Sequence, residues 1–407
     1  MPRTIISKAW LRIYCLPICY SVFIVSLALD WHVNEGRSFA LAGTLVQLWL
    51  APDVRRRLFN STQLRLMLCF PLIAAAAWWL TPYGSSGLKT FDWITCLAIG
   101  YVAAASLGRK AMVLLWLLPV ACLAATAVTA LWAFSISPNP QSVLFSGIKL
   151  RMYLEHPNRY GLLTAVCAVI VIGILPLLTQ RKRLLFSVLL AALTLLCWYS
   201  QSRAAVFSLA ATMCISMLFF LKHAPKQGLL AFLIISCVFG AGIWLGGGRI
   251  VSTVTNGSLD FLLNGREEIW QAAWEIFQKS PLVGFGVDSF RQTLEAHLNL
   301  PENLSRFPEL HAQNIFWNAH QIILGLLVEM GLPGLLLFLT LSARAIYSGI
   351  KKYPVALAPM LMLILYWCAG IGVYGFHRSW DAAIFFLAIG LIDGITSEEQ
   401  PRRLEAI

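Results

Sequence analysis

Long apolar runs alternate with short polar connections along the whole of this chain. A run of roughly 20 apolar residues is long enough to cross a bilayer as an α-helix. Such runs, bounded by charged residues, proline or glycine, predict about twelve helices. They lie near residues 11–29, 37–51, 64–81, 91–107, 111–136, 160–179, 184–200, 204–221, 228–246, 315–342, 355–373 and 380–394. The pattern therefore predicts an all-α integral membrane protein, residues 1–407 forming a single polytopic domain, with a first helix that is retained rather than cleaved.

One connection differs from the others. Residues 247–314, between the ninth and tenth predicted helices, contain no run of spanning length. Within this loop, apolar residues recur at helical spacing and share one face: Ile269, Trp270, Ala273, Trp274, Ile276 and Phe277. Pro281 ends the pattern. We expect a large loop that carries an amphipathic helix, with its two tryptophans at the membrane interface.

Composition agrees with this class of protein. Hydrophobic residues make up 58% of the 407 positions and charged residues only 12%, about half the charged share of an ordinary soluble domain. The ten cysteines all fall in apolar runs, where they act as small hydrophobic residues. The net charge of +12 therefore indicates contact with anionic membrane lipids, not with nucleic acid.

The basic residues also orient the chain. They cluster in alternate connections and in the tail: Arg55–Arg57 and Arg65, Arg109–Lys110, Arg181–Arg183, Lys222 and Lys226, Arg344 with Lys351–Lys352, and Arg402–Arg403. Because cytoplasmic loops carry an excess of lysine and arginine, both termini are predicted to be cytoplasmic. The 247–314 loop then lies on the external side.

Arg203 is the first polar residue that the orientation does not explain. It follows Ser200-Gln201-Ser202 in a very short external connection between two apolar helices. An arginine that extends from a helix start towards water is the simplest interpretation. The positive-inside rule disfavours arginine there, however, and Gln201 and Ser202 place further hydrogen-bonding groups beside it. We therefore interpret Arg203 as a candidate binding residue.

Arg266 stands at the predicted start of the amphipathic helix. A helix N-terminus attracts anions, and a guanidinium adds a planar fork suited to phosphate oxygens. Glu267 and Glu268 follow directly, as acids commonly do in a first helical turn. An ordinary solvated arginine is the alternative.

His320 lies in Asn318-Ala319-His320-Gln321, just inside the external end of the tenth predicted helix. A histidine there could accept a proton from a hydroxyl group. His311 is a competitor for this role. Glu329, about 13 Å from His320 along a helix, is better explained by a structural or helix-bending role.

A further polar group, Glu155-His156-Pro157-Asn158-Arg159, precedes the sixth predicted helix. Asn158 and Arg159 would face outwards and could contact a polar substrate, or they could simply form the helix entry.

The external loops show no paired acids and no close histidine–cysteine set, so no metal site is expected. Common hydrolase, phosphate-loop and zinc-protease motifs are also missing.

Three short motifs, taken in order, resemble the O-antigen ligase family. They are S-x-S-R-A-A from Ser200 to Ala205, G-R with W-x-x-A-x-x-x-F-x-x-x-P-x-x-G-x-G from Gly265 to Gly286, and H-x-x-x-x-x-x-x-x-E-x-G-L-P-G from His320 to Gly334. The layout of about twelve helices and one large loop is similar as well. Gln321 is a departure, because many members carry asparagine directly after the histidine.

The resemblance implies a GT-C-like glycosyltransferase of the bacterial cell inner membrane with a periplasmic active site. The donor would be an undecaprenyl-diphosphate-linked O-antigen and the acceptor a sugar of the lipid A–core oligosaccharide. Arg203 and Arg266 would hold the diphosphate. His320 would act on the acceptor hydroxyl in an inverting, metal-independent attack that needs no cofactor. Ser202, Gln201, Asn158, Arg159, His311 and Gln321 would bind substrate.

Two rival functions remain open. An O-antigen polymerase or a protein O-oligosaccharyltransferase shares the same motifs, although the latter proteins usually carry a larger external C-terminal portion. A lipid or solute transporter would instead place paired charges along a path through the bundle. Here the candidate residues gather near one face, and Glu329 is the exception.

Overall fold

The structure is a computed structural model that describes residues 11–29, 33–80, 88–136, 157–244, 266–313, 318–371 and 379–395. Every element within these residues is helical. The helices up to residue 244 are η1 (Leu11–Cys15), α2 (Leu16–Leu29), α3 (Val33–Leu50), α4 (Pro52–Asn60), α5 (Thr62–Leu80), α6 (Leu88–Cys96), η2 (Leu97–Ala103), α7 (Ala104–Leu107), α8 (Arg109–Leu114), α9 (Leu117–Ile136), α11 (Pro157–Ile174), η3 (Leu175–Leu177), α12 (Gln180–Tyr199), α13 (Arg203–His223) and α14 (Pro225–Trp244). They are followed by α17 (Glu267–Lys279), α18 (Phe290–Leu298), η4 (Pro301–Asn303), α19 (Pro308–Gln313), α20 (Ile322–Lys351), α21 (Leu357–Gly370) and α22 (Ser379–Gly394).

The predicted all-helical membrane class is confirmed. Each apolar run of the sequence coincides with a helix or with two or three consecutive helical pieces. Among the described residues, eight helices are long and apolar enough to cross a membrane. The clearest difference in bounds is the tenth predicted helix, because α20 begins at Ile322 and continues to Lys351.

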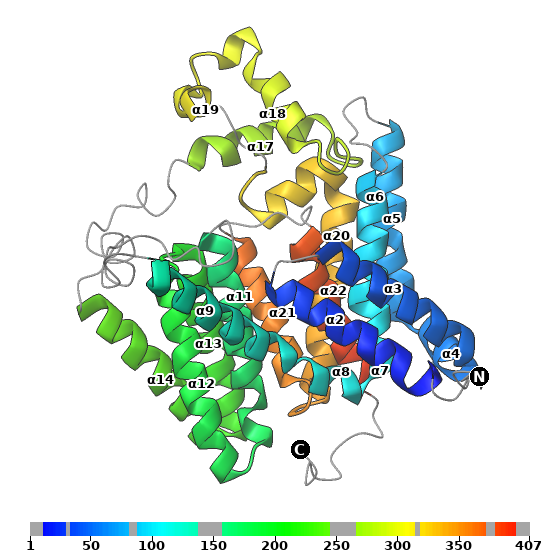
Figure 1. Ribbon diagram of the computed structural model, residues 1–407. Helices are drawn as coiled ribbons and strands as arrows, with labels where there is room; N and C mark the ends of the chain where they lie inside the picture. Colours follow the sequence, from blue (N-terminus) through cyan, green and yellow to red (C-terminus); the bar gives the residue numbers. More distant parts are fainter. Residues whose placement is uncertain are drawn as a thin grey trace.

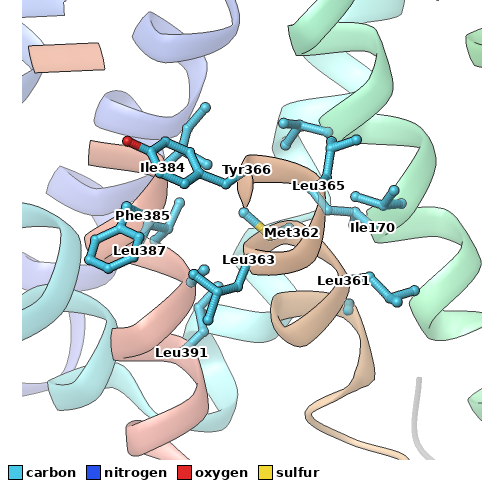
Figure 2. Close-up of a cluster of buried hydrophobic side chains, with 14 of the residues drawn as sticks. Ile170, Leu361, Met362, Leu363, Leu365, Tyr366, Ile384, Phe385, Leu387 and Leu391 are labelled. Atoms are coloured by element: carbon cyan, nitrogen blue, oxygen red, sulfur yellow. The ribbon is translucent and has the colours of Figure 1, made fainter. Parts of the chain in front are cut away.

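The main core is centred on α11 and α21, which are buried among other helices over nearly their whole length. Figure 2 shows α21 between α11 and α22, with Leu361 and Leu365 pointing towards Ile170 of α11. Leu363 points to the other side, towards Leu391 of α22. Because these helices contact protein on all sides, they are apolar all round instead of amphipathic.

A second, smaller core lies where α17, α18 and α19 pack beside the first half of α20, at the top of Figure 1. Ile269, Ala273 and Ile276 of α17 are buried there together with Phe290 of α18 and Val328 of α20. The predicted amphipathic helix therefore exists as α17. Its apolar face, however, is covered mainly by protein, so the expectation that this face lies at the membrane interface is corrected.

The two last motifs of the sequence dock on each other. Gly331 has φ +64, a conformation that breaks α20 and strongly favours glycine. At the break, the backbone N–H groups of Phe285 and Gly286 donate to the carbonyl groups of Val328 and Glu329 at 2.8 and 2.9 Å. The Leu332 N–H donates to the Pro281 carbonyl at 2.8 Å. The segment after α17 is thus fixed to the kink of α20 by backbone hydrogen bonds. The kink lies at Gly331, and Glu329 contributes its backbone carbonyl there, so a helix-bending role for the Glu329 side chain stays a prediction.

Candidate functional site

Arg203 is the first residue of α13 and follows a tight turn after α12. Gln201 in this turn has φ 52, a left-handed conformation that is uncommon for residues other than glycine. Ser202 is the N-cap of α13, and its hydroxyl accepts a hydrogen bond from the Ala205 N–H at 3.3 Å. The Ser200 hydroxyl accepts one from the Ser202 N–H at 3.2 Å. The two serines therefore hold the turn, and Ser202 uses its side chain as a cap.

The start of α11 packs directly against this turn. A Cβ atom added to Gly161 would lie 2.5 Å from the Ser200 Oγ and 2.9 Å from the Ser202 Cβ, so only glycine allows the approach. Asn158 and Arg159 belong to the same first turn of α11 and are partly exposed. The structure thus places them in the neighbourhood of the Arg203 turn. Glu155 and His156, from the same predicted group, lie outside the described residues.

Arg203 and Arg266 lie within electrostatic range of each other, although they come from distant parts of the chain. Burial lowers the pKa of Arg266, and the positive charge of Arg203 lowers this pKa further. Two like charges 4–8 Å apart repel each other by roughly 2–4 kcal/mol at an effective dielectric constant of about 20. An anion between two guanidinium groups reverses the sign of this interaction. The pair is therefore a candidate site for a strong anion.

The nearest acidic residues do not neutralise Arg266 by an ion pair. Glu268 directs its Oε2 to the backbone N–H of Leu310 at 3.0 Å, and Glu267 is exposed. Among the described residues, none of the ion pairs includes Arg266. Arg37 of α3, by contrast, pairs with Asp92 of α6 at 2.9 Å.

His320 lies in a turn before α20, so the prediction that it sits inside this helix is wrong. Its backbone has φ 50, and its N–H donates to the Asn318 Oδ1 at 2.8 Å. Such local side-chain hydrogen bonds compete with helix formation. The carbonyl of Ala319 accepts a hydrogen bond from the Trp270 indole at 3.1 Å. Because Trp270 lies about 6 Å beyond Arg266 along α17, the indole ties the His320 turn to the helix that starts at Arg266.

Gln321 and His311 take more local positions. Gln321 is the N-cap of α20, and its side-chain oxygen accepts a hydrogen bond from the Leu324 N–H at 2.5 Å. His311 belongs to α19, whose start is held at the first turn of α17 by Glu268. The His311 Nε2 is buried and has no hydrogen-bond partner within the described part of the chain. Substrate binding by either residue stays a prediction.

The structure therefore brings together three groups that are far apart in sequence. They are the α12–α13 turn with Arg203, the start of α17 with Arg266, and the turn with His320 that Trp270 holds. The sequence analysis missed Trp270, Asn318 and Gly161 as positioning residues, although Trp270 is part of a quoted motif. No group of three or more potential metal ligands occurs among the described residues.

A family model described as O-antigen ligase matches residues 186–339. Over these residues the chain is similar to the O-antigen ligase family. The part that matches this family runs from α12 to the kinked region of α20 and contains Arg203, Arg266 and His320. A search of the curated proteins finds no match to the chain. This match supports glycosyl transfer of the ligase or polymerase type.

Proposed function

We propose that this protein transfers an O-antigen polysaccharide from undecaprenyl diphosphate to the lipid A–core oligosaccharide at the periplasmic face of the bacterial inner membrane. The observation that carries the proposal is the electrostatic proximity of Arg203 and Arg266 beside the turn that holds His320. A diphosphate leaving group is negatively charged, and two neighbouring guanidinium groups can neutralise this charge. The family match supports the reaction class.

In this proposal the two arginines bind the diphosphate and stabilise the charge that develops as it leaves. Guanidinium groups form paired hydrogen bonds with phosphate oxygens. An electrostatic group of this kind contributes most when it is aimed in advance at the position of the developing charge. The cap at Ser202 and the start of α17 hold the two residues on helix ends, which supplies this preorganisation.

His320 would act on the acceptor. The acceptor hydroxyl oxygen attacks the anomeric carbon of the donor sugar and forms the new glycosidic bond. The bond between that carbon and the diphosphate oxygen breaks, and undecaprenyl diphosphate leaves with the electron pair. The proton of the hydroxyl passes to the imidazole of His320, which requires a neutral ring at the start of the step. Attack from the face opposite the leaving group inverts the anomeric centre.

The test is a transfer assay with purified protein in lipid nanodiscs. Lipid A–core and undecaprenyl-diphosphate O-polysaccharide are supplied with a metal chelator, and the core lipid is followed by gel mobility. The variants are Arg203→Ala, Arg266→Ala and His320→Ala. The matched control is Arg291→Ala, because Arg291 lies on α18 and forms an exposed ion pair with Glu295 one helical turn away, at 2.7 Å.

A ligase shifts the core lipid into a ladder that survives the chelator, and the three site variants lose this ladder whereas Arg291→Ala keeps it. A lipid-linked glycan that lengthens without any core shift would identify a polymerase instead. If neither substrate changes, the transfer proposal fails and a transport function takes its place. A ladder that the chelator abolishes would contradict the metal-independent part of the proposal.

A further inference from the structure

A cavity of about 700 Å³ lies on the other side of the bundle from α17–α19. It is formed by the end of α4, the start of α5, the last turns of α20 and the end of α22. In Figure 1, the α17–α19 group lies at the top, whereas α4 lies lower, at the right edge of the bundle. We call this cavity the α4–α5 pocket. It takes no part in the site described above, and it lies among connections that the charge pattern predicts to be cytoplasmic.

The α4–α5 pocket carries an excess of positive charge. Arg57, Arg344 and Lys351 line it, against a single carboxylate, that of Asp393. One oxygen of this carboxylate already accepts hydrogen bonds from the Ser61 hydroxyl at 2.9 Å and from the Tyr101 hydroxyl. Arg344 and Lys351 are seven residues apart on α20, which is close to two full turns, so both lie on one face of the helix.

The start of α5 adds a second feature that favours an anion. Thr62 and Gln63, the first two residues of this 19-residue helix, line the pocket. The backbone N–H groups at a helix start have no partners within the helix, and they carry the positive end of the helix dipole. The first two residues of this helix and the three cations line one cavity, and this combination suits a phosphate group.

The rim of the pocket is apolar and exposed. Tyr347 lines the cavity with 61% of its surface exposed, and Phe59, beside the lining residue Asn60, is 59% exposed. On α4, Leu58 is buried whereas Arg55 and Arg56 are exposed, an arrangement typical of a short helix that lies in a membrane interface. This apolar rim would not contribute to the binding of a soluble phosphate. The acyl chains of a lipid, by contrast, would pack against it.

We propose that the α4–α5 pocket binds the phosphate headgroup of an anionic phospholipid, whose acyl chains lie against Phe59 and Tyr347. Basic pockets between transmembrane helices on the cytoplasmic side are a recurring type of binding site for acidic lipid headgroups. The proposal is independent of the transfer reaction, since none of its residues belongs to the candidate functional site.

The test is a lipid titration of the full chain, stripped of lipid in detergent and followed by native mass spectrometry. Phosphatidylglycerol is expected to bind at least tenfold more tightly than phosphatidylethanolamine. The Arg344→Gln/Lys351→Gln double variant should weaken phosphatidylglycerol binding about tenfold. The control Arg55→Gln/Arg56→Gln removes the same charge outside the pocket and should change binding less than twofold. Inorganic phosphate at the lipid concentration should not displace the lipid.

Three results would overturn the proposal. Equal losses in the pocket variant and its control would show that only the general charge of this face matters. Displacement of the lipid by inorganic phosphate would identify a soluble anion as the ligand. The charge-retaining variant Arg344→Lys/Lys351→Arg is expected to keep its affinity, and a loss as large as that of the glutamine variant would exclude an electrostatic site. Thermal unfolding of each variant in the same detergent checks that all of them are folded.

Discussion

The molecule carries two groups of cations on different sides of the bundle, and they are built in different ways. Arg203 and Arg266 stand close together beside left-handed turns, those of Gln201 and His320. The cations of the α4–α5 pocket, Arg344 among them, project from ordinary helix ends and share their cavity with a carboxylate. One group therefore depends on an unusual backbone, whereas the other needs only regular helices.

The membrane orientation predicted from the sequence explains one of these two groups of cations but not the other. An excess of basic residues in cytoplasmic connections is a general property of membrane proteins, so the pocket cations agree with the orientation that the sequence predicts. The positive-inside rule does not explain Arg203 and Arg266, two arginines that repel each other in connections predicted to be external. Left-handed backbone at residues other than glycine costs of order 1–3 kcal/mol and persists only where the surrounding structure enforces it. The arginine pair should therefore be the more sensitive of the two groups.

The largest effect is expected when the arginine pair itself is removed. Arg203→Ala and Arg266→Ala should each lower kcat/KM for transfer by roughly 10²–10³, the usual loss for one preorganised charge-stabilising group. If both residues hold one diphosphate, the double variant should lose less than the product of the two, with a coupling of about 1 kcal/mol or more. Initial rates in nanodiscs measure all three variants.

The pocket double variant Arg344→Gln/Lys351→Gln provides the comparison and should keep its transfer rate within about twofold, because surface charges away from a site seldom matter more. If the double variant loses as much activity as the product of the two single losses, Arg203 and Arg266 would not bind the same diphosphate. A loss in the pocket variant as large as that at Arg203 would remove the distinction between the two regions.

The next effect comes from the break in α20 that holds the α17–α19 side together. Alanine at Gly331 would place a Cβ atom 2.8 Å from the backbone of Leu282, in a conformation with φ +64. Gly331→Ala should cost roughly 1–3 kcal/mol from backbone strain alone and lower both the melting temperature and the transfer rate. Gly325→Ala, in the same helix with nothing within 4 Å of the added atom, should be neutral or stabilise by about 0.5–1 kcal/mol. Equal behaviour of the two variants in thermal unfolding would contradict the proposed strain.

A smaller effect is expected at Trp270, which we interpret as a positioning residue for His320. Trp270→Phe keeps an aromatic ring, although a smaller one, and removes the N–H that donates to Ala319. A hydrogen bond of this kind contributes about 0.5–1.5 kcal/mol net, so kcat should fall roughly two- to tenfold. The KM for the donor should not change, since Arg203 and Arg266 keep their places. Trp274→Phe is the control because Trp274 is about half exposed, and a change in KM without a change in kcat would argue against the positioning role.

The positions of the helices could be predicted from the sequence because hydropathy is a local property. The long connection was harder. Periodicity showed that one face of α17 is covered, but it could not show whether lipid or protein covers it. Ile269 and Ile276 share a buried cluster with Phe290 and Val328, and this cluster depends on how distant segments fold together.

The candidate site shows the same limit. Arg203 was identified because the positive-inside rule makes an external arginine unexpected, Arg266 because it stands at a predicted helix start, and His320 because it lies at the external end of a predicted helix. The family resemblance places all three in motifs. Their arrangement was not predictable. The hydrogen bond from Trp270 to Ala319 and the approach of α11 at Gly161 are nonlocal contacts, and the capping role of Gln321 depends on where α20 begins.

The smallest predicted effect concerns pH and the polar cluster between α17 and α18. Lys279 Nζ lies 3.1 Å from His297 Nδ1, and His297 Nε2 lies 3.2 Å from Glu275 Oε2. An ammonium group can only donate, so Nδ1 accepts and the neutral ring carries its proton on Nε2, which donates to the carboxylate. Burial lowers the pKa of His297, and the charge of Lys279 lowers it as well.

The sign of the pH effect follows from this lowered pKa. When pH falls below the ordinary histidine value of about 6.5, the unfolded segment takes up a proton more readily than the folded one, so the folded state loses stability. Hydrogen–deuterium exchange of α17 and α18, corrected for intrinsic rates, should be a few-fold faster at pH 5.5 than at pH 7.5, and His297→Gln should remove the difference. No histidine is among the residues that line the α4–α5 pocket, so lipid binding there should change little over the same range. The opposite result would be a lipid affinity that changes with pH while the hydrogen–deuterium exchange of α17 does not. It would show that His297 is not the group that titrates.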